Sequence, residues 1–351
     1  MAIVRTLGGF ELADYTDEIN KIPNMWNLIG GELGLFREEV KSVYSVEFDD
    51  RDESLTLIEA NKLDTEKVEW NEQDFSNLHS VVIPHFQKAD SIKPRDIRGI
   101  RRHGTPMDFE TVDSVRADKM IRIQRSWDAT MEYARMQAIM GNVYAPTAPT
   151  NVTNWYTEFG VTRKETNHNL ADPAFDILAA IEEEVAHIQD NVLTGGNVSG
   201  VICLASPEYF QQLISSDQIE EYYKDYSTSA QAQPLRDRLA MDGNNSRTRF
   251  RKFEFQGVVF YEYRGSFADR NGVQQRLIPA NEAYYLPMGV EDMFLTYFAP
   301  ANFLDSLNIP AQRSYFFEWM NKGKNIHIHT ESNFLNMVRR PQAVTQATFV
   351  P

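Results

Sequence analysis

The feature that most constrains this fold is a strongly acidic, strand-like segment near the start of the chain. Residues 37–76 carry 13 acidic and 5 basic side chains, so about a ninth of the chain holds more than half of its net charge of −15. Within this segment, Val46 and Phe48 alternate with Glu47 and Asp49, the period-2 pattern of a half-buried strand. A two-stranded flap of this composition buries too little apolar surface to be stable alone in water. We therefore expect the flap to lie on another surface.

The charge changes sign directly after the flap. Residues 86–104 carry 6 basic and 2 acidic side chains. This basic segment is either a solvated loop with scattered charges, or the contact for the acidic flap of a neighbouring copy or for nucleic acid. The negative charge of the whole chain argues against a protein that grips nucleic acid over its entire surface, because phosphate binding is built from Lys and Arg.

Nothing in the sequence indicates a membrane or an oxidising compartment. No apolar run approaches the roughly 20 residues that span a bilayer. The first residues lack the charged start and the long apolar core of a secretory signal. Cys203 is the single cysteine, so it cannot form an intrachain disulfide. We expect synthesis in the cytoplasm.

Three helices are indicated. The longest is expected at 108–140, where apolar residues recur at spacings of three and four and Gly141 provides a stop. Its narrow apolar stripe is typical of a strut that lies across a sheet. A second helix is predicted to begin with Asp172 as N-cap and Pro173 in the first turn, and a third begins in the same way at Ser206.

The remaining pattern is typical of strands. Residues 143–159 predict strands or a hairpin, and residues 253–286 predict further strands with a turn at Asn271-Gly272. The last fifty residues alternate aromatic and polar side chains. Because strands and helices are mixed without a βαβ rhythm, the sequence predicts an α+β fold.

The motifs of catalysis are incomplete. Residues 195–200 are glycine-rich, but they lack the Lys-Ser/Thr of a phosphate loop and precede a strand instead of following one. Glu184 and His187 have the spacing of half a di-metal helix site, but no second copy exists. A solvent-facing helix side with Glu183 paired to His187 explains this spacing better. We assign no catalytic residue and no cofactor-binding residue.

His327 and His329 lie on one face of a predicted strand, and Glu331 continues that face. Such spacing can bind zinc, but further ligands must come from elsewhere in the chain. The polar face of an edge strand explains the pattern better. We therefore assign no metal, and binding at His327 and His329 stays open.

The order of strands, turns and prolines resembles a known family. The stretches that carry the resemblance are 200–207 with the amphipathic segment 208–224, 257–263, 271–273, 277–281, 284–286, 326–330, 334–335, 340–341 and 344–349. They resemble the major capsid proteins of tailed double-stranded-DNA bacteriophages of the lambda type, which have the Hong Kong 97 fold. The resemblance covers most of the chain.

The resemblance implies a division of the chain into parts. These are an N-terminal arm at 1–40, an extended β-hairpin loop at 41–85, a peripheral domain at 86–169 with a spine helix at 108–140, an axial domain at 170–290, and C-terminal strands at 291–351 that return to the peripheral domain.

The resemblance also implies a structural protein and not an enzyme. Copies would assemble as pentamers and hexamers into the icosahedral head of a virion, which encloses packaged double-stranded DNA without sequence-specific binding. Assembly would take place in the cytoplasm of the host bacterium, with no cofactor and no membrane. The implied partners are further copies of the chain, a portal and a separate scaffolding protein, since the chain opens without a long helical leader. A decoration protein is left open.

Shells of this kind need head-to-tail contacts that close into rings. Our hypothesis is that the acidic flap of one copy lies over the basic segment of its neighbour, with Glu47, Asp49, Asp50, Asp52 and Glu53 facing Arg98, Arg101 and Arg102. Shells of this family expand by rotation of their subunits. The glycines that flank the long helix are hinge candidates, with turn and cap glycines as the alternative, namely Gly99, Gly104 and Gly141.

Two other functions stay open. A shell protein of a cellular nanocompartment with the same fold predicts smaller particles that hold a protein cargo and no DNA. A β-rich, metal-dependent enzyme predicts a small oligomer with a stoichiometric metal at His327 and His329.

Overall fold

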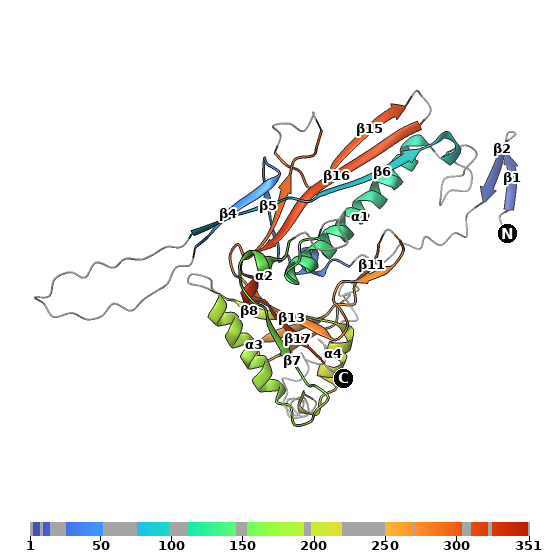
Figure 1. The fold of residues 1–351 in the computed structure, drawn as a ribbon. Coiled ribbons are helices and arrows are strands. Elements are labelled where there is room, and N and C mark those ends of the chain that lie inside the picture. The colour runs from blue at the N-terminus through green and yellow to red at the C-terminus, as the bar shows by residue number, and fades with distance from the viewer. Residues whose placement is uncertain are drawn as a thin grey trace, which may run out of the picture.

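The computed structural model describes residues 3–7, 10–14, 26–51, 76–97, 111–144, 153–192, 198–219, 250–269, 271–303, 310–321 and 325–349. Two sheets and the helices packed on them form its body, and a two-stranded hairpin projects from that body (Figure 1). Among the helices of these ranges, none is long and apolar enough to cross a membrane.

The first half of the chain contains two small hairpins, one long helix and short connecting elements. In chain order they are β1 (Ile3–Leu7), β2 (Phe10–Asp14), the π-helical turn η1 (Leu28–Glu32), β3 (Arg37–Val40), β4 (Ser45–Arg51), β5 (Ser76–Val82), β6 (His85–Ile92), the 3₁₀ turn η2 (Pro94–Asp96), α1 (Val112–Ile139), α2 (Trp155–Glu158) and β7 (Lys164–Asn167).

The second half is richer in strands. In chain order its elements are α3 (Ile177–Asn191), β8 (Gly200–Ala205), α4 (Pro207–Ile214), β9 (Lys252–Phe255), β10 (Val258–Glu262), β11 (Ser266–Ala268), β12 (Gln274–Arg276), β13 (Glu282–Met288), β14 (Phe294–Ala299), β15 (Tyr315–Asn321), β16 (Asn325–Val338), the 3₁₀ turn η4 (Pro341–Ala343) and β17 (Thr345–Thr348).

One sheet has six strands in the order β7-β17-β13-β8-β10-β9. β8 lies inside it, antiparallel to β13 and parallel to β10. Helices α3 and α4 pack on one face, through residues such as Ile181 and Leu213. The other face packs on the end of α1, through Met136 and Ile139. Because β8 is buried on both faces, its sequence is a continuous apolar run.

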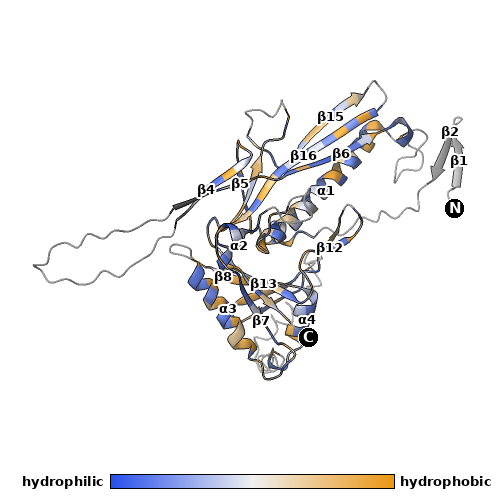
Figure 2. Cartoon of the chain, viewed as in Figure 1, coloured by the Kyte–Doolittle hydropathy of each residue, from blue (hydrophilic) through white to orange (hydrophobic). Residues whose placement is uncertain are grey.

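The other sheet has the order β15-β16-β14-β3, and β6 also pairs with β16. α1 lies along this sheet (Figure 1), where Ile123, Trp127 and Met131 pack with Phe86 and Ile328. Hydrophobic and hydrophilic bands alternate along β15 and β16, as expected for strands with two unlike faces (Figure 2). α1 therefore connects the two sheets, since its middle packs on this sheet and its last turn packs on the six-stranded sheet.

The long helix confirms the predicted stop at Gly141, and the third helix confirms the predicted cap at Ser206. α1 runs over Val112–Ile139, inside the predicted 108–140, and is capped by Thr111, whose side chain accepts the N–H of Ser114. Gly141 follows its last turn, as expected. Ser206 caps α4, where its hydroxyl accepts the N–H of Tyr209.

The predicted start of the second helix is wrong. α3 begins at Ile177, and its N-cap is Asp176, whose carboxylate accepts the N–H of Ala179 at 3.0 Å. Asp172 instead closes a turn, because its side chain accepts the N–H of Ala174 at 2.9 Å. The same residue type thus serves two kinds of local turn four positions apart.

The strands expected at 143–159 are also largely absent from the described part of that range. Asn142 and Asn154 form an isolated antiparallel bridge, and the short helix α2 follows directly. Asn154 caps α2, since its side chain accepts the N–H groups of Tyr156 and Thr157. Trp155 and Phe159 pack in the core between the flap base and strands β14 and β16 instead of lining a hairpin.

Candidate assembly surfaces

The base of the acidic flap is the β4–β5 hairpin, which leaves the body as a pair of strands (Figure 1). Its inner face is apolar, with Val46 buried and Phe48 half-buried. The Phe48 ring lies 5.3 Å from the ring of His79 and 5.4 Å from that of Phe159. Glu47 points to solvent on the other face. The predicted alternation is confirmed at Val46, Glu47 and Phe48, and it leaves Glu47 exposed.

The residues of the predicted flap contact are described only in part. Glu47 is exposed on β4, and Asp49 and Asp50 follow on the same strand, where the structure describes the backbone. The rest of the set lies outside the described residues, namely Asp52, Glu53, Arg98, Arg101 and Arg102. The contact between the flap and the basic segment therefore stays a prediction.

In the described part of the basic segment, one cation is bonded to the long helix and another extends into solvent. Lys88 donates from Nζ to the Ser126 hydroxyl of α1 at 2.7 Å, and burial lowers the pKa of Lys88. Arg95 is 79% exposed in its side chain and lies 3.7 Å from the carboxylate of Asp96. Lys88 thus holds β6 on the long helix, whereas Arg95 is available to a partner.

The end of α1 is bound to two other elements. Gly141 has a φ of +86°, and a Cβ atom there would overlap the ring of Tyr156. Arg163 donates to the carbonyl of Met140 and to the side chain of Gln346, and its guanidinium lies 4.6 Å from the Tyr156 ring centroid. Gly141 is thus a helix-cap glycine in a packed joint.

The hinge candidates are not tested by these contacts. A cap glycine can also be a pivot when the joint around it loosens, so the hinge role of Gly141 stays a prediction. Gly99 and Gly104 lie outside the described residues.

Several large apolar side chains are exposed that the sequence analysis missed, and the most exposed lie near the flap base and on β15. One group lies at the base of the flap, where Val82 is 71% and Val40 is 57% exposed, beside Val43 and Tyr44. The other is Met320, which is 64% exposed near the tip of the β15–β16 hairpin. An alternating pattern places side chains on two faces of a strand, but it does not tell which faces another element covers. Contiguous apolar groups on a surface mark interaction sites.

The histidines of β16 are occupied by other partners. His329 Nε2 lies 3.0 Å from Glu331 Oε1, and the ring of His327 stacks on Trp319 with 5.4 Å between centroids. Within the described ranges, no group of three or more His, Cys, Asp or Glu side chains could hold a metal ion. Both histidines thus belong to the hydrogen bonding and ring packing of the sheet.

The interpretation of Glu184 as a solvent-facing residue is wrong. Its carboxylate is fully buried between α3 and β7, 3.8 Å from Nε2 of His168. Glu183 forms its ion pair with Lys164 at 2.9 Å and not with His187. α3 is oriented so that Glu184 faces β7 in the interior, and the spacing of Glu184 and His187 in the sequence does not reveal this orientation.

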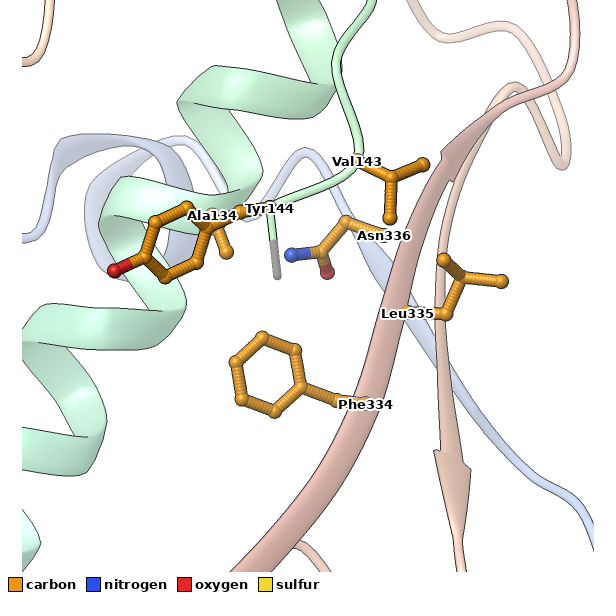
Figure 3. Close-up of a pocket in the computed structure, with 6 residues that line it drawn as sticks. All are labelled: Ala134, Val143, Tyr144, Phe334, Leu335 and Asn336. Atoms are coloured by element: carbon orange, nitrogen blue, oxygen red, sulfur yellow. The ribbon is translucent and has the colours of Figure 1, made fainter. Parts of the chain in front are cut away.

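A cavity lies between α1 and β16, as Figure 3 shows. Its volume of about 10 Å³ is at the lower limit for one water molecule. Six residues line it, namely Ala134, Val143, Tyr144, Phe334, Leu335 and Asn336. The site is a packing defect and is too small for a substrate.

Comparison with known proteins places this architecture in a family. The sequence matches the family described as phage major capsid protein E over residues 11–349. It is 38% identical over 344 residues to the major capsid protein of Pseudomonas phage KPP10, covering 96% of each chain. It is 28% identical over 349 residues to the major capsid protein of Salmonella phage Felix O1, covering 95% of this chain and 94% of that protein.

The fold is shared more widely than the sequence. The capsid of Ralstonia phage GP4 superposes with a TM-score of 0.52 at 12% identity, covering 96% of this chain and 95% of that chain. The predicted fold class, α+β of the Hong Kong 97 capsid type, is confirmed by such neighbours. A projecting flap, a long helix between two sheets and a match over nearly the whole sequence agree with one another, and this chain belongs to the phage major capsid protein E family.

Proposed function

We propose that copies of this chain assemble as pentamers and hexamers, and that the closed shell encloses a double-stranded DNA genome. The coarser role is established by the family, because this chain is a major capsid protein of tailed phages that forms the icosahedral shell. The observation that carries the proposal is the family match over 11–349, which includes the flap, both sheets and the long helix.

The parts of the chain would divide the work of assembly. We propose that the arm comprises residues 1–40, the extended loop 41–85, the peripheral domain 86–169 and the axial domain 170–290. Strands β14, β15 and β16 of the segment 291–351 lie in the sheet that also holds β3 and β6, which supports a return to the peripheral domain. β17 lies in the six-stranded sheet, so the last strand would be shared with the axial domain.

In the proposed rings, the acidic flap of one copy lies over the basic segment of the next. Glu47 of the flap and Arg95 of the basic segment support this arrangement, because both charged side chains are exposed to solvent. Interface charges of this kind fix register and partner choice more than affinity. Many such weak contacts hold each copy in a shell, so no single contact needs to be strong.

The remaining partners follow from the role of a container. We propose that the shell forms in the bacterial cytoplasm with a separate scaffolding protein and a portal, and that the chain has no catalytic activity. The net charge of −15 suits a wall that repels DNA weakly, since this repulsion is screened within roughly 10 Å at physiological salt.

A reciprocal charge swap tests the flap contact. Arg101→Glu with Arg102→Glu should leave the subunit folded by circular dichroism but abolish shells in negative-stain micrographs. Asp52→Arg with Glu53→Arg should do the same. Combining both pairs should restore shells, because the two charged segments again have opposite signs. Normal shells from either half of the swap would refute the contact, and wild-type protein that forms no particles at all would refute the proposed function.

A further inference from the structure

The chain enters the body through a tight turn that packs against α1. In η1, Leu28 and Ile29 are fully buried in the core between α1 and the six-stranded sheet. The turn closes when the N–H of Leu33 donates to the carbonyl of Leu28 at 2.9 Å. The first N–H groups of such a turn have no carbonyl partner inside it. The N–H groups of Ile29 and Gly30 must therefore find acceptors elsewhere.

Both N–H groups are taken by one carboxylate of the long helix. Glu132 Oε1 accepts the N–H of Ile29 at 2.7 Å, and Oε2 accepts the N–H of Gly30 at 3.0 Å. Oε1 also accepts the hydroxyl of Tyr263, which follows β10 in the six-stranded sheet, at 2.6 Å. Glu132 is 1% exposed, so its charge is held by these donors and not by water.

The glycine in the turn allows this approach. A Cβ atom on Gly30 would lie 3.2 Å from Glu132 Oε2 and would overlap the guanidinium of Arg135. A side chain at this position would therefore push the turn off the helix. Gly30 thus has a geometric function, because a residue with a Cβ atom does not fit between the turn and α1.

A second residue, one turn along α1, holds the chain where it leaves the turn. Arg135 is 4% exposed and donates to Glu38 Oε1 on β3 at 2.9 Å. Its guanidinium lies 5.5 Å from the centroid of the Phe36 ring. The path of the backbone from residue 28 to residue 38 is thus fixed on α1 at both ends.

We propose that Glu132 is a positioning residue for assembly, which fixes the direction in which the N-terminal arm leaves the subunit. This proposal rests on the proposed function, in which the N-terminal arm reaches a neighbour while its last part, residues 28–40, packs in its own subunit. The carboxylate of Glu132 on α1 binds η1, where the arm meets the body, and also binds Tyr263 beside the six-stranded sheet. In every copy of the shell, the arm then leaves the subunit at the same position relative to the two sheets.

Hydrogen exchange of the unassembled subunit tests the anchor without requiring shells. Glu132→Ala should increase the exchange of the amides of Ile29 and Gly30 by about 30-fold, with a smaller increase for Tyr263→Phe, which removes one donor only. The matched control is Glu184→Ala, which removes another buried carboxylate but leaves residues 26–36 protected. Gly30→Ala keeps Glu132 and should release the same segment, which covers the case in which Glu132→Ala does not fold.

Micrographs of each variant under wild-type assembly conditions give the second readout. We expect no closed shells of wild-type diameter from Glu132→Ala and Gly30→Ala, and such shells from Glu184→Ala. Equal protection of residues 26–36 in all three variants would overturn the anchor, as would shells of wild-type diameter from Glu132→Ala. If the amides of Ile29 and Gly30 exchange faster in Glu132→Ala but the wild type never forms particles, the proposed function is overturned and the anchor is not.

Discussion

At the scale of single residues, the buried carboxylate of Glu184 makes a prediction about pH. Burial alone would raise its pKa, but the neighbouring His168 and Thr166 side chains outweigh burial, so the pKa lies below its ordinary value of 4.5. A carboxyl group whose pKa is lowered by folding stabilises the protein above its unfolded pKa. This contribution is lost as the pH falls below about 4.5 towards the lowered pKa of the folded state.

The Glu184→Gln variant isolates this contribution. At pH 7 we expect a loss of about 1–3 kcal/mol in the free energy of unfolding, because the neutral amide loses the charge that strengthens these hydrogen bonds and buries an NH2 group at the position of Oε2, which has no hydrogen-bond partner. The difference between wild type and variant in the urea midpoint should shrink as the pH is lowered to about 3. A difference that stays constant over this range would contradict the linkage.

Gly141 and Gly160 allow two reasons for a glycine to be compared, namely a positive φ and the lack of space for a Cβ atom. Both have positive φ, at +86° and +64°, but a Cβ atom would overlap Tyr156 at Gly141 and would meet nothing within 4 Å at Gly160. We expect Gly160→Ala to cost about 1 kcal/mol from backbone strain alone, and Gly141→Ala to cost about 1–2 kcal/mol more. Thermal unfolding of the two variants measures the difference, and equal losses would show that the ring moves aside without cost.

At the scale of elements, the starts of the helices show what a local signal can and cannot predict. Ser206 caps α4 as expected, because β8 ends directly before it and the chain has to turn there. The same signal at Asp172 fails, since a contact from outside the segment fixes the start of α3. Gln218 accepts the N–H of Ile177 at 3.1 Å and donates to the carbonyl of Phe175 at 2.7 Å.

This difference predicts the effect of removing each aspartate. Asp176→Ala should lower the free energy of unfolding by about 1 kcal/mol, the usual loss of an N-cap. Asp172→Ala should cost less, because its hydrogen bond closes an exposed turn and no helix depends on it. Urea denaturation measures both losses. A larger loss at Asp172 would mean that the turn at 172–175 is required to form α3.

The flap and the long helix were predictable because each depends on a repeat in the sequence. The alternation at 46–48 correctly predicted a strand, and the apolar stripe at 108–140 correctly predicted a long helix. The anchor at Glu132 could not be found in this way. A glutamate within a helix is typical of a solvent-facing side, and its three donors come from residues 102, 103 and 131 positions away.

At the scale of the whole molecule, the surface that is left uncovered indicates how copies meet. Glu47 is exposed at the flap base, and the apolar side chains of Val82 on the paired strand and of Val40 are exposed as well. Contiguous apolar patches larger than a few hundred Å² are rare on soluble monomers and mark interaction sites. The described part of the chain thus exposes a charged side chain and several apolar side chains near the flap base, which suits the proposed contacts between copies.

Val82 gives the sharpest test of this surface, since it is 71% exposed on a strand and its replacement leaves the core intact. Assembly stabilises the folded state by mass action, so the unfolding temperature of the wild type should rise with protein concentration. Val82→Glu should unfold at the temperature of the dilute wild type at every concentration, because a carboxylate in an apolar contact opposes association. The control Val82→Thr keeps a β-branched side chain and should retain most of the concentration dependence. A wild type that is monomeric and unfolds at one temperature at all concentrations would exclude assembly through this surface.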